Sequence, residues 1–169
     1  MVTKAQYDFL DYVSFPSSGK LVNDGTEGRV YIGWYPQRVR LAVNPDATLK
    51  VEYNAKGQNT VYGSHVSIDG WNGTEWRRLI NIPPKLLPLG SFDWRVISES
   101  FKIPPDVTVI GYQPSAGAGD RATPGITWFD DLKIYQNGVP IYENKFSNWA
   151  PIIIPAEIIT GVAMIKYLK

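Results

Sequence analysis

Two adjacent carboxylates, Asp130 and Asp131, stand in the middle of the stretch ITWFDDLKIYQNG, whose composition is otherwise that of a β-strand. Aspartate is depleted from strands, so the pair needs a chemical or structural reason. Three reasons are open: a catalytic dyad, a metal site, or a part of how the sheet is built. Because successive side chains of a strand point to opposite faces, the two carboxylates diverge. They are a poor start for a glycosidase, whose two acids flank one bond.

The alternation along this strand places Asp130 on the same face as Trp128, Leu132 and Ile134, and we expect that face to be the core face. A buried carboxylate must accept backbone N–H bonds, pair with a cation or bind a metal, because an unpaired buried charge costs too much. The sequence therefore predicts that Asp130 is an architectural acid.

Other reactive groups are few. The chain has no Cys, and His65 is its single histidine, so a Ser-His-Asp triad would have to use that residue. The surrounding segment TVYGSHVSI resembles a strand, and a lone histidine there is more often a polar residue on a half-exposed face than a catalytic group. No phosphate-binding glycine loop, zinc helix or nucleophile elbow is present. We therefore expect no catalytic residues and no enzymatic activity.

Aromatic side chains offer a different chemistry. The chain has six Trp and ten Tyr residues, whose rings can stack on sugars while neighbouring polar groups bind the hydroxyls. Trp34 and Tyr35 in GWYPQR, and Trp71 in DGWNGTEW, are the candidate stacking residues, because both stretches are expected to form turns. The alternative is that these rings belong to the core or to a subunit interface, which is the commoner use of aromatic residues in β-sandwiches.

Composition limits the partners. With 17 basic and 16 acidic residues, the chain has no electrostatic footprint for nucleic acid. No window has the eighteen or so apolar residues of a transmembrane segment. The amino terminus, MVTKAQYDFLDYV, lacks the apolar core of an export signal. We expect a location at the cell surface if the chain belongs to a secreted parent, and in a virion if it is an assembly subunit.

The elements that position these residues are short runs rich in Val, Ile, Tyr, Trp and Phe, separated by Gly, Pro, Asn and Asp. Turns are expected at Asp69-Gly70, Asn72-Gly73 and Asn137-Gly138, and a long loop at Gln113–Gly125. The pattern predicts an all-β fold, a single-domain jelly-roll β-sandwich of two antiparallel sheets. The predicted strands are Tyr7–Phe15, Arg29–Trp34, Val39–Val43, Thr48–Asn54, Thr60–Ile68, Glu75–Ile80, Trp94–Ile103, Thr108–Tyr112, Ile126–Tyr135, Val139–Asn144 and Ile158–Tyr167.

We expect residues 1–151 to form the sandwich domain and residues 152–169 to form an apolar carboxy-terminal strand or tail. This segment either closes the protein's own sandwich or pairs with a neighbouring subunit. The lack of Cys and the proline-rich loops are also compatible with a thermostable protein.

The stretch DWRVISESFKIPPDVTVIGYQ, followed by ITWFDDLKIYQNG, resembles the second half of carbohydrate-binding modules with a galactose-binding-like β-jelly-roll fold. In that group a Trp and a strand ending in F-x-I-P precede a strand bearing W-F-D-D-L/V. The similarity covers Thr74–Tyr135. It implies a jelly roll that binds glycans, and a structural Asp130 in a setting where the matching carboxylate often helps to bind calcium.

Calcium takes six or more oxygen ligands, and this chain has no clustered D-x-D-x-D loop to supply them. The sequence therefore favours Asp130 without a metal, and a structural calcium ion is the alternative. Two functions follow. The first is a non-enzymatic glycan-binding module. The second is a structural assembly subunit built on a single jelly roll, such as a viral capsid, virion or filament protein, whose partners are copies of itself or other subunits.

Overall fold

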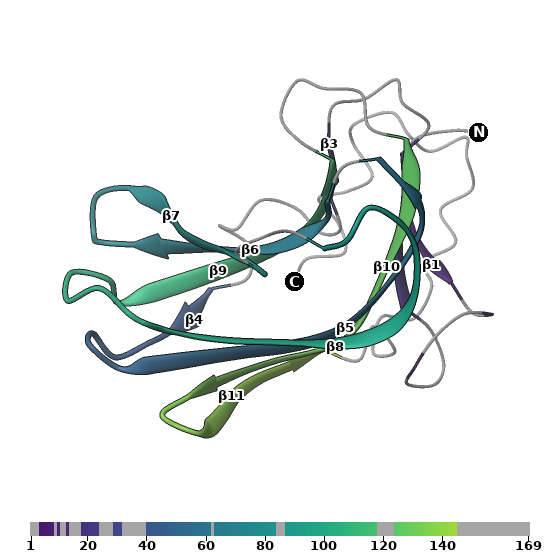
Figure 1. Ribbon diagram of the computed structural model, residues 1–169. Coiled ribbons are helices and arrows are strands. Elements are labelled where there is room, and N and C mark those ends of the chain that lie inside the picture. Colours follow the sequence, from purple (N-terminus) through teal and green to yellow (C-terminus); the bar gives the residue numbers. More distant parts are fainter. Residues whose placement is uncertain are drawn as a thin grey trace, which may run out of the picture.

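The computed structural model of the protein describes residues 4–8, 10, 13, 18–23, 29–31, 40–61, 63–83, 87–117 and 124–144. These residues form two antiparallel β-sheets that pack face to face as the layers of a single β-sandwich domain (Figure 1). The predicted all-β architecture is confirmed. Among the described residues, no helix is long and apolar enough to span a membrane.

The sheets combine strands that lie far apart in the sequence. One sheet has six strands, in the order β1-β2-β10-β5-β8, with β11 paired to β10, and the other has five, in the order β3-β9-β6-β7, with β4 paired to β9. The six strands are β1 (Lys4–Asp8), β2 (Ser18–Asn23), β5 (Thr48–Thr60), β8 (Gly90–Lys102), β10 (Gly125–Gln136) and β11 (Val139–Asn144). The five strands are β3 (Arg29–Tyr31), β4 (Leu41–Ala42), β6 (His65–Trp71), β7 (Trp76–Ile82) and β9 (Val109–Gly117).

The core lies between the sheets and is built by alternation. From Leu49 to Gly57 every second residue of β5 is buried, including Val51 and Tyr53, while the residues between them are less covered. Val66 and Ile68 of β6 close the core from the other side. Because apolar side chains fill one face of each sheet, burial of this area is the main force that holds the layers together.

A buried hydrogen bond also joins the layers. The Tyr53 hydroxyl on β5 donates to the Ile82 carbonyl at the end of β7, at 2.5 Å. Burial of the phenol raises the pKa of Tyr53 well above its ordinary value of 10.0, because the ionised form would lose its hydration. The ring packs at 5.7 Å, centroid to centroid, from that of Phe129. Tyr53 therefore acts as a neutral polar link inside an apolar core.

The hairpin between β10 and β11 is the one that the sequence predicts. Asn137 and Gly138 have φ angles of 49° and 82°, the left-handed conformation that two-residue hairpin turns require. The Asn137 side-chain oxygen accepts a hydrogen bond from the Thr48 N–H, and the Asn137 N–H donates to the Thr48 carbonyl, both at 2.9 Å. The turn therefore fastens the hairpin to the start of β5.

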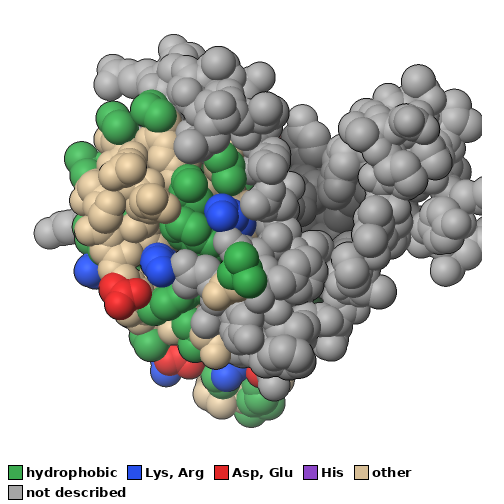
Figure 2. Space-filling model, turned by 90° about the vertical axis from the view of Figure 1, so that its right-hand side faces the viewer, with side chains coloured by type: hydrophobic (Ala, Val, Ile, Leu, Met, Phe, Trp, Pro, Cys, Tyr) green, Lys and Arg blue, Asp and Glu red, His purple; other side chains and the backbone are tan. Residues whose placement is uncertain are grey.

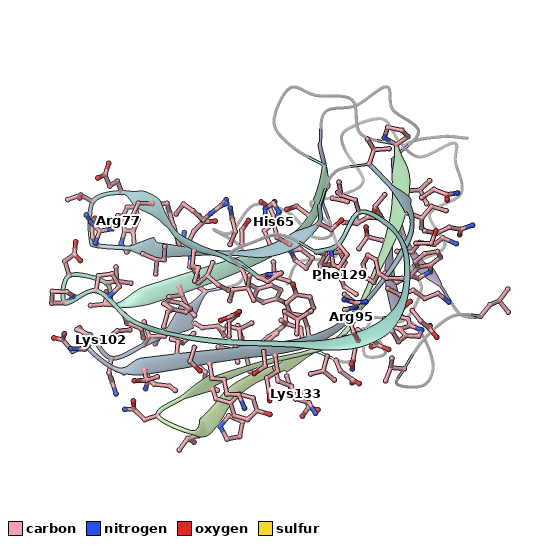
Figure 3. The ribbon with its side chains drawn as sticks, viewed as in Figure 1. His65, Arg77, Arg95, Lys102, Phe129 and Lys133 are labelled. Atoms are coloured by element: carbon pink, nitrogen blue, oxygen red, sulfur yellow. The ribbon has the colours of Figure 1, made fainter. Side chains whose placement is uncertain are left out.

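The prediction that Asp130 lies on the core face of its strand is wrong. The register of β10 against β5 shifts between Asp130 and Lys133, and Asp131 has a φ of 50°, which marks a β-bulge. The extra residue reverses the alternation, so Phe129, Leu132 and Ile134 face the core. Figure 3 shows Phe129 between the layers and Lys133 on the outside. Asp130 instead lies on the outer side, where it pairs in register with Asn54.

Other differences concern strand limits. Ser18–Asn23 forms β2, which the sequence analysis did not predict, because Ser and Gly residues at its start hide a strand that is fixed by its neighbours β1 and β10. Strand β9 continues to Gly117, into the stretch expected to be a long loop, and Asp69-Gly70 lies inside β6 rather than in a turn. The predicted strand Ile158–Tyr167 and the tail at 152–169 lie outside the described residues.

Candidate functional site

The outer face of the five-stranded sheet carries polar and aromatic side chains instead of a simple solvated surface. Strand β6 alternates between Val66 and Ile68, which enter the core, and residues that point away from it. Figure 3 shows His65 on this outer side of the sheet. We call this surface the β6 face; the register of β6 with β7 and β9 gives its members as His65, Ser67, Asp69, Trp71, Trp76, Arg78, Asn81, Gln113 and Ser115.

An aromatic pair forms one end of the β6 face. The β6–β7 hairpin turns at Asn72 and Gly73, where the Asn72 side-chain oxygen accepts from the N–H groups of Thr74 and Glu75, both at 2.9 Å. This turn places Trp71 directly opposite Trp76. Their ring centroids are 5.7 Å apart with a tilt of 43°, and both side chains are partly exposed. The pair is a rigid aromatic platform at a strand end.

A chain of polar contacts runs beside this platform. Arg78 Nε donates to Asp69 Oδ1 at 2.6 Å, and the same guanidinium donates through Nη1 to Asn81 Oδ1, also at 2.6 Å. The Ser67 hydroxyl donates to the same Asn81 oxygen at 3.2 Å. These contacts fix the side chains in one arrangement, with donors and acceptors on a line across β6 and β7.

Asp69 has one carboxylate oxygen in an unusual state. The side chain is 9% exposed, and Oδ2 has no hydrogen-bond partner among the described residues, while Oδ1 is held by Arg78. A buried acceptor without a donor is costly, and the ion pair of the other oxygen with Arg78 holds the carboxylate in this position. Asp69 and Trp71 lie two residues apart on one face of β6, which separates their Cα atoms by roughly 7 Å.

The other end of the β6 face is buried. His65 is 3% exposed and its Nε2 forms a hydrogen bond of 2.9 Å with the hydroxyl of Ser115, its register partner on β9. The histidine expected on a half-exposed face is therefore a buried, hydrogen-bonded one. No catalytic arrangement follows from this pair, because a hydroxyl nucleophile would have to be open to a substrate.

The candidate residues of the sequence analysis fall in different places. Trp71 belongs to the β6 face and is partly exposed. Trp34 and Tyr35 lie outside the described residues. Asp130 belongs to the six-stranded sheet, whereas Trp71 belongs to the five-stranded one.

Asp130 is fully buried, and backbone donors satisfy both of its oxygens. Val13 N–H donates to Oδ2 and Asp131 N–H donates to Oδ1, each at 2.8 Å. The carboxylate thus joins the Val13 segment to the bulge in β10. The described residues contain no group of three or more His, Asp or Glu side chains that could hold a metal ion. The structural calcium ion stays a prediction.

Sequence reasoning did not single out Asp69, Arg78, Asn81 or Gln113. The signal that identifies them is the register of the β6–β7 hairpin, because a turn at Asn72-Gly73 puts Asp69 opposite Arg78 and Trp71 opposite Trp76. The sequence also predicted a turn at Asp69-Gly70. A turn there would end the strand before Trp71, so the pairing of Asp69 with Arg78 was not recognised.

The chain is similar to known proteins in its fold. No protein-family model matches the chain, and no curated protein matches it. Among solved structures, a family 16 carbohydrate-binding module is 12% identical with a TM-score of 0.55, and the match covers 79% of this chain and 86% of that chain. The CBM22-1 xylan-binding domain from Paenibacillus barcinonensis Xyn10C is 7% identical with a TM-score of 0.51, covering 79% and 81% of the two chains.

A third match is the Clostridium thermocellum xylanase 10B structure with CBM22-1 and GH10 modules, complexed with xylohexaose. It is 15% identical with a TM-score of 0.52, and the match covers 85% of this chain but 26% of that one, so the chain spans about a quarter of its length. Likeness at these identities shows the fold alone. The fold is that of a carbohydrate-binding-module-like jelly roll, as the resemblance implied.

Proposed function

We propose that the protein is a non-catalytic glycan-binding module whose β6 face holds the sugar chain. The observation that carries the proposal is the partly exposed Trp71–Trp76 pair, which lies on one face of β6 and β7 together with the Arg78–Asp69 ion pair. A pyranose ring offers an apolar face of C–H groups for an indole and hydroxyl groups at its rim for a guanidinium. The two features on one face of β6 match these two parts of a sugar.

The polar chain supplies orientation. Asp69 Oδ1 and Asn81 Oδ1 hold the Arg78 guanidinium, and its partial exposure leaves it open to a ligand hydroxyl. Asn81 and Gln113 stand on either side of Ser67 in the register of the sheet, so amide groups flank the middle of the face. Groups that are already fixed bind a ligand with a smaller loss of side-chain entropy.

The fold supports the same class of function and no more than the class. Neighbours with this fold are named carbohydrate-binding modules, two of them with xylan or xylohexaose in their titles. Xylan is therefore the first ligand to test. Trp34 and Tyr35 remain proposed stacking residues, and the absence of catalysis is part of the proposal.

A glycan array with the full chain, followed by calorimetric titration of xylohexaose and of any array hit, tests the proposal. Trp71→Ala, Trp76→Ala and Asp69→Asn are each expected to weaken binding by about tenfold or more, or about 1.4 kcal/mol, because the first two remove a stacking contact and the third removes the charge that holds Arg78. Trp34→Ala tests the second aromatic candidate in the same way.

The matched control is Tyr135→Ala, which removes a partly buried ring from the other sheet. It should leave glycan affinity unchanged. An array without hits, or hits that all three β6-face variants bind as well as the parent protein does, contradicts the proposal.

A further inference from the structure

Strand β8 forms one edge of the six-stranded sheet. It has 13 residues and ends the path of the sheet, and β5 is the described strand that pairs with it. All of its residues are at least partly exposed, and Val96 on the outer face is 70% exposed. The far side of an edge strand presents backbone N–H and C=O groups to which a further strand can pair. The β8 edge is therefore a surface at which a partner's strand can extend the sheet.

Two residues of opposite charge face the inner side of the sheet at this edge. Arg95 and Glu99 lie opposite Ala55 and Val51 of β5, whose side chains are buried in the core. The Arg95 guanidinium carbon lies 4.9 Å from the centroid of the Phe92 ring, which packs against the same core. Arg95 is exposed and Glu99 is partly exposed, so both charges are accessible at the edge.

The spacing of these charges favours one register between two copies of β8. Identical edge strands pair antiparallel about a two-fold axis perpendicular to the sheet, so facing residues lie on the same face. An axis at Ile97 sets Arg95 opposite the partner's Glu99, and Glu99 opposite the partner's Arg95. An axis one residue away sets Arg95 opposite an apolar residue, and an axis two residues away sets like charges opposite each other. Facing opposite charges stabilise a pair of strands, whereas like charges destabilise it.

The backbone around Ile97 is suited to such pairing. The register of β8 with β5 is unbroken from Arg95 to Lys102, and its irregularities lie beyond Arg95, towards Gly90. Figure 2, which views the molecule from the right-hand side of Figure 1, shows basic, acidic and hydrophobic side chains side by side on the described surface. With both signs present, the facing pairs select the position of a partner, rather than a long-range field of one sign.

We propose that the β8 edge binds a second copy of this chain, so that two sandwiches form a dimer with its two-fold axis at Ile97. Backbone hydrogen bonds join the two edges, and two Arg95–Glu99 pairs fix the register. The same inward charges discourage pairing with strands that lack the matching pattern. An interface of one strand pair is small, so the dimer belongs to the weak, transient class and dissociates on dilution, which frees the edge amides of β8.

The symmetry of this dimer has a consequence for binding. A two-fold axis perpendicular to the sheets leaves the outer faces of both copies pointing the same way, so both β6 faces look in one direction. Two sites on one side raise the avidity for a polymeric glycan without any new contact. This consequence rests on the proposed function, whereas the dimer itself does not, because its test contains no glycan.

The test is sedimentation equilibrium of the full chain from about 0.02 to 1 mM, a range that brackets weak complexes. We expect a reversible equilibrium between monomer and dimer. Amide exchange of residues 95–99, measured by NMR over the same range, should slow as the concentration rises. A chain that stays monomeric throughout, or that forms larger assemblies, overturns the proposal. Protection of these amides that does not depend on concentration also overturns it, because the chain itself would then cover the edge.

Charge reversals identify the register. Arg95→Glu and Glu99→Arg each replace two attractive pairs by two repulsive ones, and each should weaken dimerisation by about tenfold or more. The double variant Arg95→Glu/Glu99→Arg restores opposite charges at both positions and should dimerise as the parent protein does. Lys102→Glu is the matched control, because it makes the same change of charge on the same strand, opposite the partner's neutral Phe92. It should leave dimerisation unchanged.

The rescue keeps the test sharp if a single reversal also disturbs folding, which circular dichroism reports. A dimer that neither single reversal weakens relative to Lys102→Glu overturns the Arg95–Glu99 pairing. A double variant that stays as weak as the single reversals overturns it as well, because two complementary charges would then have failed to restore the contact. Loss of glycan binding in the Trp71→Ala protein with dimerisation intact separates the dimer from the β6 face.

Discussion

The hydroxyl group of Tyr53 joins the two sheets through one hydrogen bond, and its removal tests how much that bond contributes to stability. In Tyr53→Phe the Ile82 carbonyl loses a buried donor at 2.5 Å, while the packing of the ring is kept. We expect the free energy of unfolding to fall by about 1–3 kcal/mol, the usual cost of an unsatisfied buried polar group. Chemical denaturation at pH 7 measures it. An unchanged unfolding free energy would show that the carbonyl finds another donor.

The same residue predicts a pH dependence. Burial raises the pKa of Tyr53 in the folded state, so the unfolded protein loses this proton first as the pH passes 10.0. The unfolded state then binds fewer protons than the folded state, and stability falls with rising pH. Denaturation curves between pH 8 and about 11 should show a steeper loss in the parent protein than in Tyr53→Phe. Parallel losses in the two proteins would contradict this assignment.

Asp131 occupies a left-handed backbone position, which Asp and Asn tolerate better than β-branched residues. Asp131→Val is expected to cost about 1–3 kcal/mol of stability, because it combines backbone strain with the loss of the hydrogen bond from Asn54 Nδ2 to Asp131 Oδ2. Asp131→Asn keeps the conformation and should lie within about 0.5 kcal/mol of the parent. Equal thermal stabilities of the two variants would argue against strain at the bulge.

Reasoning about single residues from the sequence was therefore correct only in part. It identified Asp130 as an architectural acid, and the two backbone donors agree with that role. It assigned the wrong face, since strict alternation cannot anticipate an extra residue in a strand. Two adjacent aspartates after the aromatic pair Trp128-Phe129 are the trace of that bulge, because the second aspartate suits a positive φ.

At the level of elements, the β10–β11 hairpin depends on its turn. Gly138 has a φ of 82° with no atom near its missing side chain, so Gly138→Ala tests backbone conformation alone. We expect a loss of about 1 kcal/mol, measured as a lower midpoint of thermal unfolding. Val139→Ala, next to the turn on an exposed position, serves as a control and should have little effect. A Gly138→Ala midpoint equal to that of the control would contradict the turn.

The strands that the sequence predicts best are those whose own residues specify them. Strand β11 was predicted with its observed limits because a strong turn signal precedes it and an apolar run fills it. Strand β2 escaped because its opening residues, Ser18 and Gly19, form a strand only between the partners β1 and β10. At such places the pairing with distant strands overrides the local conformational preference of the residues. A single sequence does not reveal which strands will pair.

At the scale of the whole molecule, the order of strands predicts a gradient of protection. Strands β5 and β10 are paired on both sides, whereas β8 and β7 end the paths of their sheets. Amide hydrogen exchange should therefore be slowest in β5, β10 and β6, and faster at the outward-facing amides of β7 and β8. Exchange measured by NMR gives the order directly. Protection in β8 equal to that in β5 would indicate that another strand covers the β8 edge.

The fold was more accessible to sequence reasoning than the site. Runs of apolar residues with turn signals specify a β-sandwich, whichever way the strands connect. The β6 face required the hairpin register that pairs Trp71 with Trp76, and the close approach of Phe92 to Gly57 required the pairing of β5 with β8. Both depend on pairs that only the folded chain brings together. The assembly alternative rests on residues 152–169, outside the described part, and stays a prediction.

The bulge in β10 divides that strand into two halves. Before the bulge the odd-numbered Phe129 faces the core, and after it the even-numbered Leu132 and Ile134 do so. Removing the codon for Lys133, outside the bulge, would make Leu132 and Ile134 direct neighbours on opposite faces, so one of the two would be driven out of the interior. Substitutions in this strand exchange one side chain, but a shortened strand would misdirect a whole half of it. In this protein the number of residues in β10 is thus constrained as strictly as their types.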